Sequence, residues 1–332
     1  WICSGSRRPR TRSGEARMEI PLLDLSVKDP SLKAELMQAV DRVLSHGRLV
    51  LGPEVEHFEE EIAEVCQRKY AVGVSSGSDA LYLALRSLDI GPGDEVITTP
   101  LSWIATANAI TLCGATPVYV DIKEDLNIDP DLVEAAITPR TKVILPVHFT
   151  GKLCNMTRIA EIASAHGILL VEDAAQAFGA HYNGAMAGSF GHISCFSMNS
   201  MKILNSYGEA GALVMDDQQL QEKLFLLRYA GTVSNEDCHY PSLNGKLDTI
   251  QAAMLLVSLQ HYKGKISRRR KMAEFYSRAL GEVVAYPREE PGYHSIYYTY
   301  TIVAERRDEL KQHLMSRGIE TKIHHPILMP HH

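Results

Sequence analysis

The chain has 332 residues, of which 45% are hydrophobic and 22% are charged, and its formal net charge is −6. This composition is ordinary for a globular protein, and the length suffices for one large domain with a smaller one attached. The acidic balance argues against nucleic acid as a partner, because phosphate backbones require a concentrated basic face. No apolar run approaches the ~20 residues of a membrane-spanning helix, so we expect no membrane partner.

Residues 1–17 differ from the rest of the chain. They contain five arginines and little apolar sequence, and fold-like sequence begins only at Met18. They lack the apolar segment of a secretory signal, so we expect a disordered leader outside the fold, either a basic targeting arm or an artefact of upstream translation. The cysteines show no paired spacing and indicate reduced thiols of a cytoplasmic protein, several of them in the core; they are Cys3, Cys66, Cys113, Cys154, Cys195 and Cys238.

The first clear helical periodicity lies in residues 53–66. Apolar side chains recur there at spacings of three and four, at Val55, Phe58, Ile62 and Val65. This spacing predicts an amphipathic helix. The glutamates at positions 56 and 59–61 are expected on its solvated face.

A strand that contains Val72 and Val74 leads into a turn of small residues and then into a helix. The first N–H groups of a helix have no intrahelical partner and attract anions. The turn therefore offers a phosphate site, with Ser76, Gly77, Ser78 and Asp79 as its candidates. Taken alone, Ser78 is more simply explained as the N-cap of the helix, and only the lysine motif further along the chain favours the phosphate site.

Apolar, β-branched runs then alternate with helical stretches, near 130–136 and 155–166 among others. This alternation predicts an α/β fold with a mostly parallel sheet covered on both sides. The carboxyl ends of parallel strands meet at one edge, where ligands bind. Residues at or just past such ends are Ser76, Trp103, His148 and Asp173. His148 is interpreted either as a group near the ligand or as a hydrogen-bonded structural histidine.

An acidic pair, Glu172-Asp173, ends the apolar run 168–171, and Lys202 follows Asp173 by 29 positions. Such a pair suits pyridoxal phosphate: a lysine amine holds the aldehyde as a Schiff base, and a carboxylate keeps the pyridine nitrogen protonated. Most single aspartates and lysines are solvated surface groups, so the spacing alone does not establish the site.

The remaining sequence predicts a strand at 212–215, a helix at 217–230, a strand at 297–303 and a helix at 306–317. It also predicts a long helix that contains Ile250, Met254, Leu255 and Val257. We expect a large domain at 18–245 and a small α+β domain at 246–332. The basic run 268–271 is interpreted as a solvated helix face, with contact to a substrate diphosphate as the alternative. Four histidines near the C-terminus lack cysteine or carboxylate partners, so no metal is expected; they are His324, His325, His331 and His332.

Several blocks, in order, resemble the DegT/DnrJ/EryC1/StrS family of sugar aminotransferases: SSGSDAL, SWIATANAI, VEDAAQAFGA, FSMNSMK and SYGEAGALV. The resemblance implies the fold of the fold-type I pyridoxal-phosphate enzymes. It also implies that Asp173 faces the pyridine nitrogen, that Gln176 lies near the phenolic oxygen and that Lys202 forms the Schiff base. Ser197 matches a residue that contacts the phosphate, together with the turn at 76–79.

Two further positions carry roles implied by the resemblance. Trp103 matches an aromatic residue that stacks on the pyridine ring, and the alternative is that it fills the core. Asn244 matches an asparagine that reaches the cofactor phosphate of the neighbouring subunit in a homodimer. Lys246 stands where the family commonly has arginine, and this removes the planar fork needed for bidentate contacts.

The function implied by the resemblance is amination of a nucleotide-diphosphate-linked keto-deoxysugar, with glutamate as the amino donor. Relatives that are sugar dehydratases carry histidine in place of the Schiff-base lysine, so Lys202 argues against that class. Relatives that aminate cyclitols or form an aminobenzoate remain alternatives, as does a regulatory protein that binds the cofactor without catalysis. The family continues beyond the position of His332, so the small domain is expected to be truncated.

Overall fold

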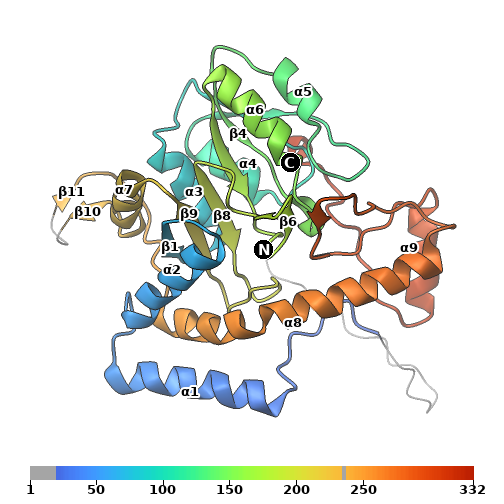
Figure 1. Cartoon of the computed structure of the whole chain (residues 1–332), viewed down its shortest axis with the longest axis horizontal. Helices are drawn as coiled ribbons and strands as arrows, with labels where there is room; N and C mark the ends of the chain where they lie inside the picture. The colour runs from blue at the N-terminus through green and yellow to red at the C-terminus, as the bar shows by residue number, and fades with distance from the viewer. Residues whose placement is uncertain (1–19, 234–236) are drawn as a thin grey trace. The chain divides into compact units, whose positions relative to one another are not determined.

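Seven strands form the central sheet in the order β1-β9-β8-β5-β4-β2-β3. The computed structural model describes residues 20–233 and 237–332, and the predicted leader 1–17, with Cys3, lies outside them. The strands are β1 (Tyr70–Val74), β2 (Glu95–Thr98), β3 (Thr116–Tyr119), β4 (Thr141–Leu145), β5 (Leu169–Asp173), β8 (Ile193–Ser197) and β9 (Gly211–Met215). Only β9 runs antiparallel to its neighbours, β1 and β8, and the other pairs are parallel. The predicted mostly parallel sheet is confirmed (Figure 1).

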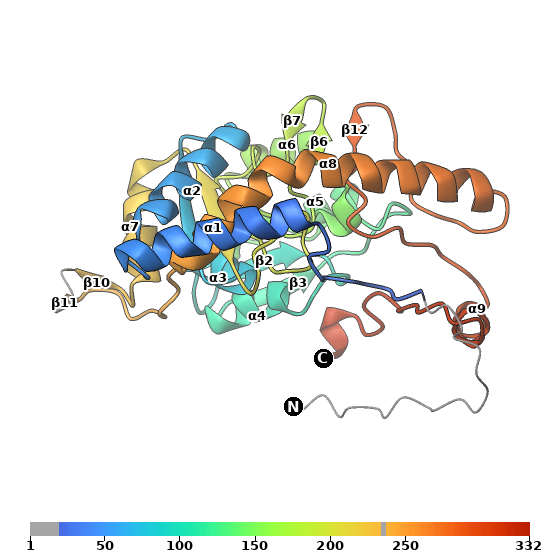
Figure 2. The ribbon, with the colours of Figure 1, turned by 90° about the horizontal axis from the view of Figure 1, so that it is seen from below.

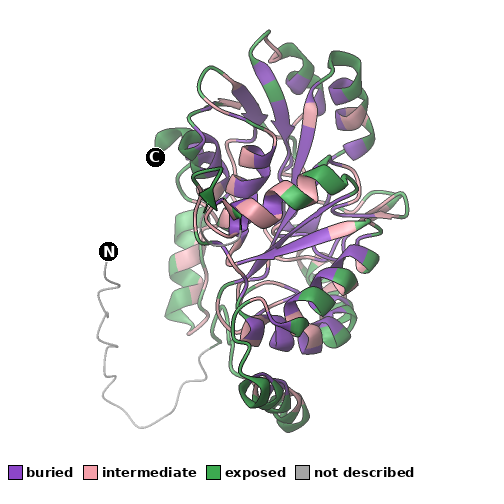
Figure 3. Cartoon of the chain, turned by 90° about the vertical axis from the view of Figure 1, so that its left-hand side faces the viewer, coloured by how far each residue is buried: buried purple, intermediate pink, exposed green. Residues whose placement is uncertain are grey.

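Helices cover both faces of this sheet. They are α2 (Pro53–Val65), α3 (Gly77–Ser87), α4 (Ala105–Leu112), α5 (Pro130–Ala135), α6 (Met156–His166), α7 (Gln218–Arg228) and α8 (Thr249–Leu280). Successive strand residues join different apolar clusters, as Val96 and Ile97 do, because side chains alternate between the faces of a strand. One cluster includes α3, α4 and α7, and the other includes α2, α5, α6 and α8. Figure 3 shows the buried residues on the inward sides of these helices.

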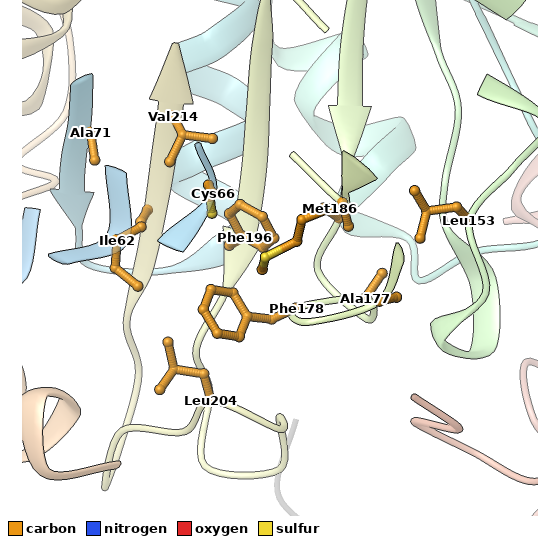
Figure 4. Close-up of a cluster of buried hydrophobic side chains, with 14 of the residues drawn as sticks. Ile62, Cys66, Ala71, Leu153, Ala177, Phe178, Met186, Phe196, Leu204 and Val214 are labelled. Carbon is orange, nitrogen blue, oxygen red and sulfur yellow. The ribbon is translucent and has the colours of Figure 1, made fainter. Parts of the chain in front are cut away.

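Aromatic and sulfur-containing side chains fill the core beneath α8. Phe178 packs edge-to-face on Phe196, with ring centroids 5.4 Å apart, and Tyr262 of α8 packs on Phe178 at 5.2 Å. Met186 and Cys66 lie in the same cluster (Figure 4). Cys113, Cys154 and Cys195 are also buried, whereas Cys238 is exposed, so the prediction of several core cysteines is confirmed. Burial raises the pKa of each of the four buried thiols and leaves them unreactive.

Helix α1 (Pro30–His46) was not predicted, although its ends carry ordinary signals. Asp29 caps the first turn by accepting from the N–H of Ser31, Pro30 occupies the first position, and Gly47 ends the helix in a left-handed conformation. The helix lies along α8 (Figure 2), and buried Leu36, Ala39 and Val43 face α8.

The acidic face of α2 is solvated only in part, which corrects the expectation. Glu59 is buried and forms an ion pair with buried Arg228, and it also accepts from the backbone N–H of Gly73 at 2.7 Å. Burial raises the pKa of Glu59, and the charge of Arg228 opposes that shift. Because the helix packs on β1, one glutamate of the run turns inward and needs a cationic partner.

The predicted strand at 297–303 is wrong. The segment forms no ladder, and Val303 only bridges to Ala285. Its backbone is held by other groups: Arg269 donates to the carbonyls of Tyr297 and Tyr298, at 3.3 and 2.7 Å. The tyrosines of this segment favour a strand in sequence but pack on other rings instead. Tyr300 contacts the rings of Tyr276 and Tyr286, which lie outside the segment.

The basic run on α8 is also less solvated than expected. Arg270 forms a bidentate pair with Glu289, at 2.8 and 3.0 Å, and donates to the carbonyl of Ser295 at 2.6 Å. Arg269 is occupied as described above, whereas Arg268 and Lys271 are exposed. Two of the four basic side chains therefore hold the segment that follows α8 in place through hydrogen bonds.

Contacts divide the chain into two units. Of the described residues, the smaller contains 20–24 and Ala304–His324, and the larger contains those of Leu25–Val303 together with His325–His332. Within the smaller unit, Ile20 pairs with the chain after α9 (Arg307–Ser316), through Gly318 and Glu320. The predicted domain boundary at 245/246 stays a prediction. No described helix is both long enough and apolar enough to cross a bilayer.

Candidate active site

The candidate residues gather at the carboxyl edge of the sheet. Asp173 is the last residue of β5, Ser197 is the last of β8, and Ser76 follows β1. Trp103 lies in the connection from β2 to α4, and Lys202 in the loop from β8 to β9. Parallel strands bring these sequence-distant positions to one edge, as predicted.

Asp173 is a buried carboxylate with a donor on each oxygen. Its Oδ2 accepts from Thr106 Oγ1 at 2.8 Å, and its Oδ1 accepts from the N–H of Ala175 at 3.2 Å. Burial raises the pKa of this carboxyl, while the two hydrogen bonds and the positive charge of Lys202 oppose the rise. The site thus holds an anionic acceptor out of water, which a cationic ring nitrogen would satisfy.

Lys202 is half-buried, and its amine lies over an aromatic face. Its Nζ is 4.5 Å from the ring centroid of Tyr298, and its backbone N–H donates to Asn199 at 2.8 Å. Sequence reasoning missed Tyr298, because it placed this residue in a strand. Gly151 allows the approach: a Cβ there would lie 2.6 Å from Ile296 Cγ1 and 2.8 Å from the backbone nitrogen of Tyr298.

The start of α3 is a capped helix N-terminus, which is the geometry that the predicted phosphate site requires. Ser76, not Ser78, is the N-cap, and its Oγ accepts from the N–H of Asp79 at 3.1 Å. The N-cap interpretation of Ser78 was therefore wrong; Ser78 is exposed at the open end of the first turn. The first-turn N–H groups of Gly77 and Ser78 remain for a ligand. Asp79 supports the turn, because its carboxylate accepts from Ser75.

Ser197 lies directly against this helix start. A Cβ built on Gly77 would be 2.5 Å from Ser197 Cβ and 3.0 Å from its Oγ, closer than real side chains approach. Only glycine permits this contact, so the hydroxyl of Ser197 is placed beside the first turn of α3. The structure thus brings together the two halves of the predicted phosphate site.

Trp103 and Gln176 occupy opposite environments. Trp103 is 61% exposed, which excludes the core-filling alternative, and its ring lies 6.2 Å from that of His325. Gln176 is buried, and its Oε1 accepts from the N–H of Thr150 at 3.0 Å. This bond fixes the amide with its NH₂ group left to donate. The roles of Trp103 and Gln176 towards the cofactor stay predictions.

His148 is a structural histidine. It is fully buried, its Nδ1 accepts from the N–H of Cys154 at 3.3 Å, and its Nε2 lies 2.9 Å from Glu172 Oε2. Because a backbone N–H occupies Nδ1, the ring proton is on Nε2 and is donated to Glu172. Of the two interpretations left by the sequence, the structure supports the structural one.

Asn244 lies on the chain before α8 and is exposed. Its backbone bridges to Tyr229, and the carbonyl of the next residue, Gly245, accepts from the N–H of Ser75 at 2.9 Å. Lys246 places its Nζ 4.1 Å from the ring centroid of Tyr229. A role for Asn244 across a dimer stays a prediction. Within the described residues, no cluster of three or more metal-binding side chains occurs.

Comparison with known proteins identifies the family of the chain. The model of the DegT/DnrJ/EryC1/StrS aminotransferase family matches residues 30–332. The chain belongs to this family. A crystal structure of DesV from S. venezuelae in complex with a ketimine intermediate has a TM-score of 0.90 and 43% identity, covering 93% of this chain and 84% of that chain. The family fold predicted from sequence is confirmed.

Two curated relatives illustrate the range of names in the family. A dTDP-3-amino-3,4,6-trideoxy-alpha-D-glucose transaminase of Streptomyces venezuelae is 43% identical, over 93% of this chain and 82% of its own length. A pleiotropic regulatory protein of Geobacillus stearothermophilus is 41% identical, over 93% of this chain and 85% of its own. Similar solved chains include forms with pyridoxal phosphate or pyridoxamine phosphate bound. The chain is thus a pyridoxal-phosphate-dependent aminotransferase.

The residues of this chain fit that cofactor. A buried carboxylate that accepts from two neutral donors, and from no cationic group among the described residues, suits the pyridinium nitrogen. The start of α3, which lies against Ser197, suits the phosphate. Lys202, whose positive charge opposes the rise in the pKa of Asp173, suits the aldehyde. Asp173, Lys202 and the 76–79 turn would hold the three ends of one molecule.

Proposed function

We propose that the enzyme transfers an amino group from L-glutamate to a nucleotide-diphosphate-linked keto-deoxysugar in a ping-pong reaction. The observation that carries this proposal is the convergence of a buried carboxylate, a lysine and a helix N-terminus at one sheet edge. The substrate class is supported by the transaminase names of relatives that share about two-fifths of the sequence. The donor is carried over from the family.

In this proposal each residue has a distinct task. Bound pyridoxal phosphate supplies an electron sink for the pair released from a substrate C–H bond. Lys202 would hold the cofactor aldehyde at rest, and its freed Nζ would carry the proton between the substrate carbon and the C4′ atom of the cofactor. Asp173 would keep the ring nitrogen protonated. Trp103 would cover the ring, Gln176 would donate to the phenolic oxygen, and Ser197 and the 76–79 turn would bind the phosphate.

We also propose a cytoplasmic homodimer, in which Asn244 completes the phosphate site of the partner subunit. The exposure of Asn244 leaves its amide accessible to a second chain. Four buried, unpaired cysteines suit a reducing compartment. Sedimentation of the purified protein as a monomer at all concentrations would contradict the dimer.

A regulatory role is the second candidate, because one relative bears a regulatory name. Such a protein would bind the cofactor and show no reaction with an amino donor. An enzyme of the cyclitol-aminating or aminobenzoate-forming kind would react with an amino donor but would not aminate a nucleotide-linked sugar. Lys202 itself argues against the dehydratase alternative.

Replacement of Lys202 tests the proposed site directly. After incubation with pyridoxal phosphate and reduction with borohydride, the wild-type protein should carry one stable adduct on the peptide that contains Lys202. Lys202→Ala should carry none while remaining folded. Lys223→Ala, on α7, is the matched lysine control and should label as the wild type does. Persistence of the adduct in Lys202→Ala would contradict the assignment.

A further inference from the structure

Thr106 has a contact that its place in the sequence does not explain. It lies in the first turn of α4, is 1% exposed, and reaches a carboxylate 67 positions away, Asp173, at 2.8 Å. A threonine near a helix start usually bonds to its own backbone. This hydroxyl instead faces the one acidic group assigned to the cofactor ring.

A second hydroxyl lies behind the first. Ser102 Oγ is 3.0 Å from Thr106 Oγ1, and Ser102 is 4% exposed. An ionised carboxylate only accepts, so the single hydroxyl proton of Thr106 goes to Asp173. Ser102 must then donate to Thr106. The two hydroxyls form a directed chain, in which each bond polarises the next.

The chain constrains what Asp173 can do. Oδ2 of Asp173 accepts a hydrogen bond from Thr106, and Oδ1 accepts one from the N–H of Ala175. Both donors favour the charged carboxylate over the neutral acid in a buried place, where charge is otherwise disfavoured. These two hydrogen bonds fix the orientation of the carboxylate, so the remaining lone pairs of Asp173 point in a fixed direction. The same β2–α4 connection carries Trp103, whose carbonyl accepts from the N–H of Thr106 at 3.1 Å.

We propose that Thr106 is a positioning residue that keeps Asp173 charged and aimed at the cofactor's ring nitrogen, with Ser102 supporting Thr106. This inference rests on the proposed function of Asp173. It predicts that loss of the Thr106 hydroxyl weakens the interaction with the ring nitrogen and spares the other contacts to the cofactor.

The test compares two ligands: pyridoxal phosphate and its analogue with the ring nitrogen replaced by C–H. Dissociation constants are measured for wild type, Thr106→Val and Thr106→Ser. Loss of a hydrogen bond to a charged group should weaken pyridoxal phosphate binding by about 10- to 100-fold in Thr106→Val. The carbon analogue should bind wild type and Thr106→Val alike. Thr106→Ser keeps the hydroxyl and should retain wild-type preference for the nitrogen ring.

Two results would overturn the inference in distinguishable ways. If wild type prefers the nitrogen ring and Thr106→Val keeps that preference, Thr106 has only a structural role. If wild type itself does not distinguish the two ligands, Asp173 does not face the ring nitrogen, and the proposed site fails with the inference. Should Thr106→Val not fold, Ser102→Ala carries the test. It should lose part of the preference, and an unchanged preference would overturn the role of the chain of hydroxyls.

Discussion

Glu172 and Asp173 are chain neighbours with opposite environments, because successive side chains of a strand point to opposite faces. Asp173 points to the candidate site. Glu172 points into the fold, where it accepts from His148, Ser194 and three backbone N–H groups of residues 188–191, all within 3.0 Å. Burial alone would raise the pKa of Glu172, but these donors, His148 foremost, lower it from 4.5 to about 2.

This network makes a pH-dependent contribution to stability. A carboxyl whose pKa is lower in the folded protein stabilises the fold above its unfolded pKa and loses that effect as the pH falls. Here a contribution of about 3 kcal/mol should be complete above about pH 4.5 and be lost as the pH falls towards about 2. Glu172→Gln should lower the free energy of unfolding at pH 7 by about that amount. Urea unfolding of both proteins at pH 7 and at about pH 3 measures it, and the difference between them should fall to less than about half at the lower pH.

Glu60→Gln, an exposed position of α2, is the control for that experiment. It should change the free energy of unfolding by less than about 0.5 kcal/mol. Equal stability of the two variants would contradict the role assigned to Glu172.

For single residues, the sequence predicts the charged groups of the site but not the neighbouring side chains that contact them. Asp173 and Lys202 were found because they lie in motifs of recognisable order. Thr106 lies in the block SWIATANAI, but the block does not show which residue its hydroxyl reaches, and Tyr298 lies in no quoted block. The importance of both depends on contacts with residues far along the chain. Glu59 was misassigned for the same reason: its partner, Arg228, lies 169 positions away.

The proposed phosphate site depends on the junction of α3 with β8. Gly77 begins α3, and its missing side chain lets the helix start rest on Ser197. Gly77→Ala should push these two segments apart. We expect at least a tenfold weaker affinity for pyridoxal phosphate, and a loss of stability of about 1–3 kcal/mol from overpacking.

Gly264→Ala is the matched control for that prediction. Gly264 lies inside α8, and a Cβ there meets nothing within 4 Å. Alanine should therefore leave cofactor affinity unchanged and stabilise the helix by up to about 1 kcal/mol. Titration with pyridoxal phosphate, together with thermal unfolding, compares the two variants. Equal affinity in both would show that the close approach at Gly77 does not shape the site.

Element types along the sheet were predictable because strand and helix patterns alternate from α2 at residue 53 to the end of β5 at residue 173. The prediction failed after α8. Tyr297 to Val303 has the composition of a strand, but Arg269 occupies its backbone acceptors and the tyrosines pack on one another. Local propensity gave way there to tertiary contacts.

On the scale of the whole molecule, the proposed homodimer predicts that two inactive variants restore each other. Lys202→Ala lacks the catalytic amine, and Asn244→Ala lacks the proposed contact to the partner's phosphate. In a mixed dimer with shared sites, one of the two sites contains both wild-type residues, so activity should recover towards a quarter of the wild-type level in an equal mixture. No recovery, with subunit exchange demonstrated, would contradict shared sites.

The central claim is that Lys202 and Asp173 operate an aminotransferase site in this chain. The most direct test is the absorption spectrum of purified protein with pyridoxal phosphate, before and after addition of L-glutamate, with 2-oxoglutarate measured in parallel. We predict that the band of the lysine-bound cofactor converts to the pyridoxamine phosphate form, with one 2-oxoglutarate released per site. A lysine-bound cofactor that leaves glutamate unchanged would contradict the account.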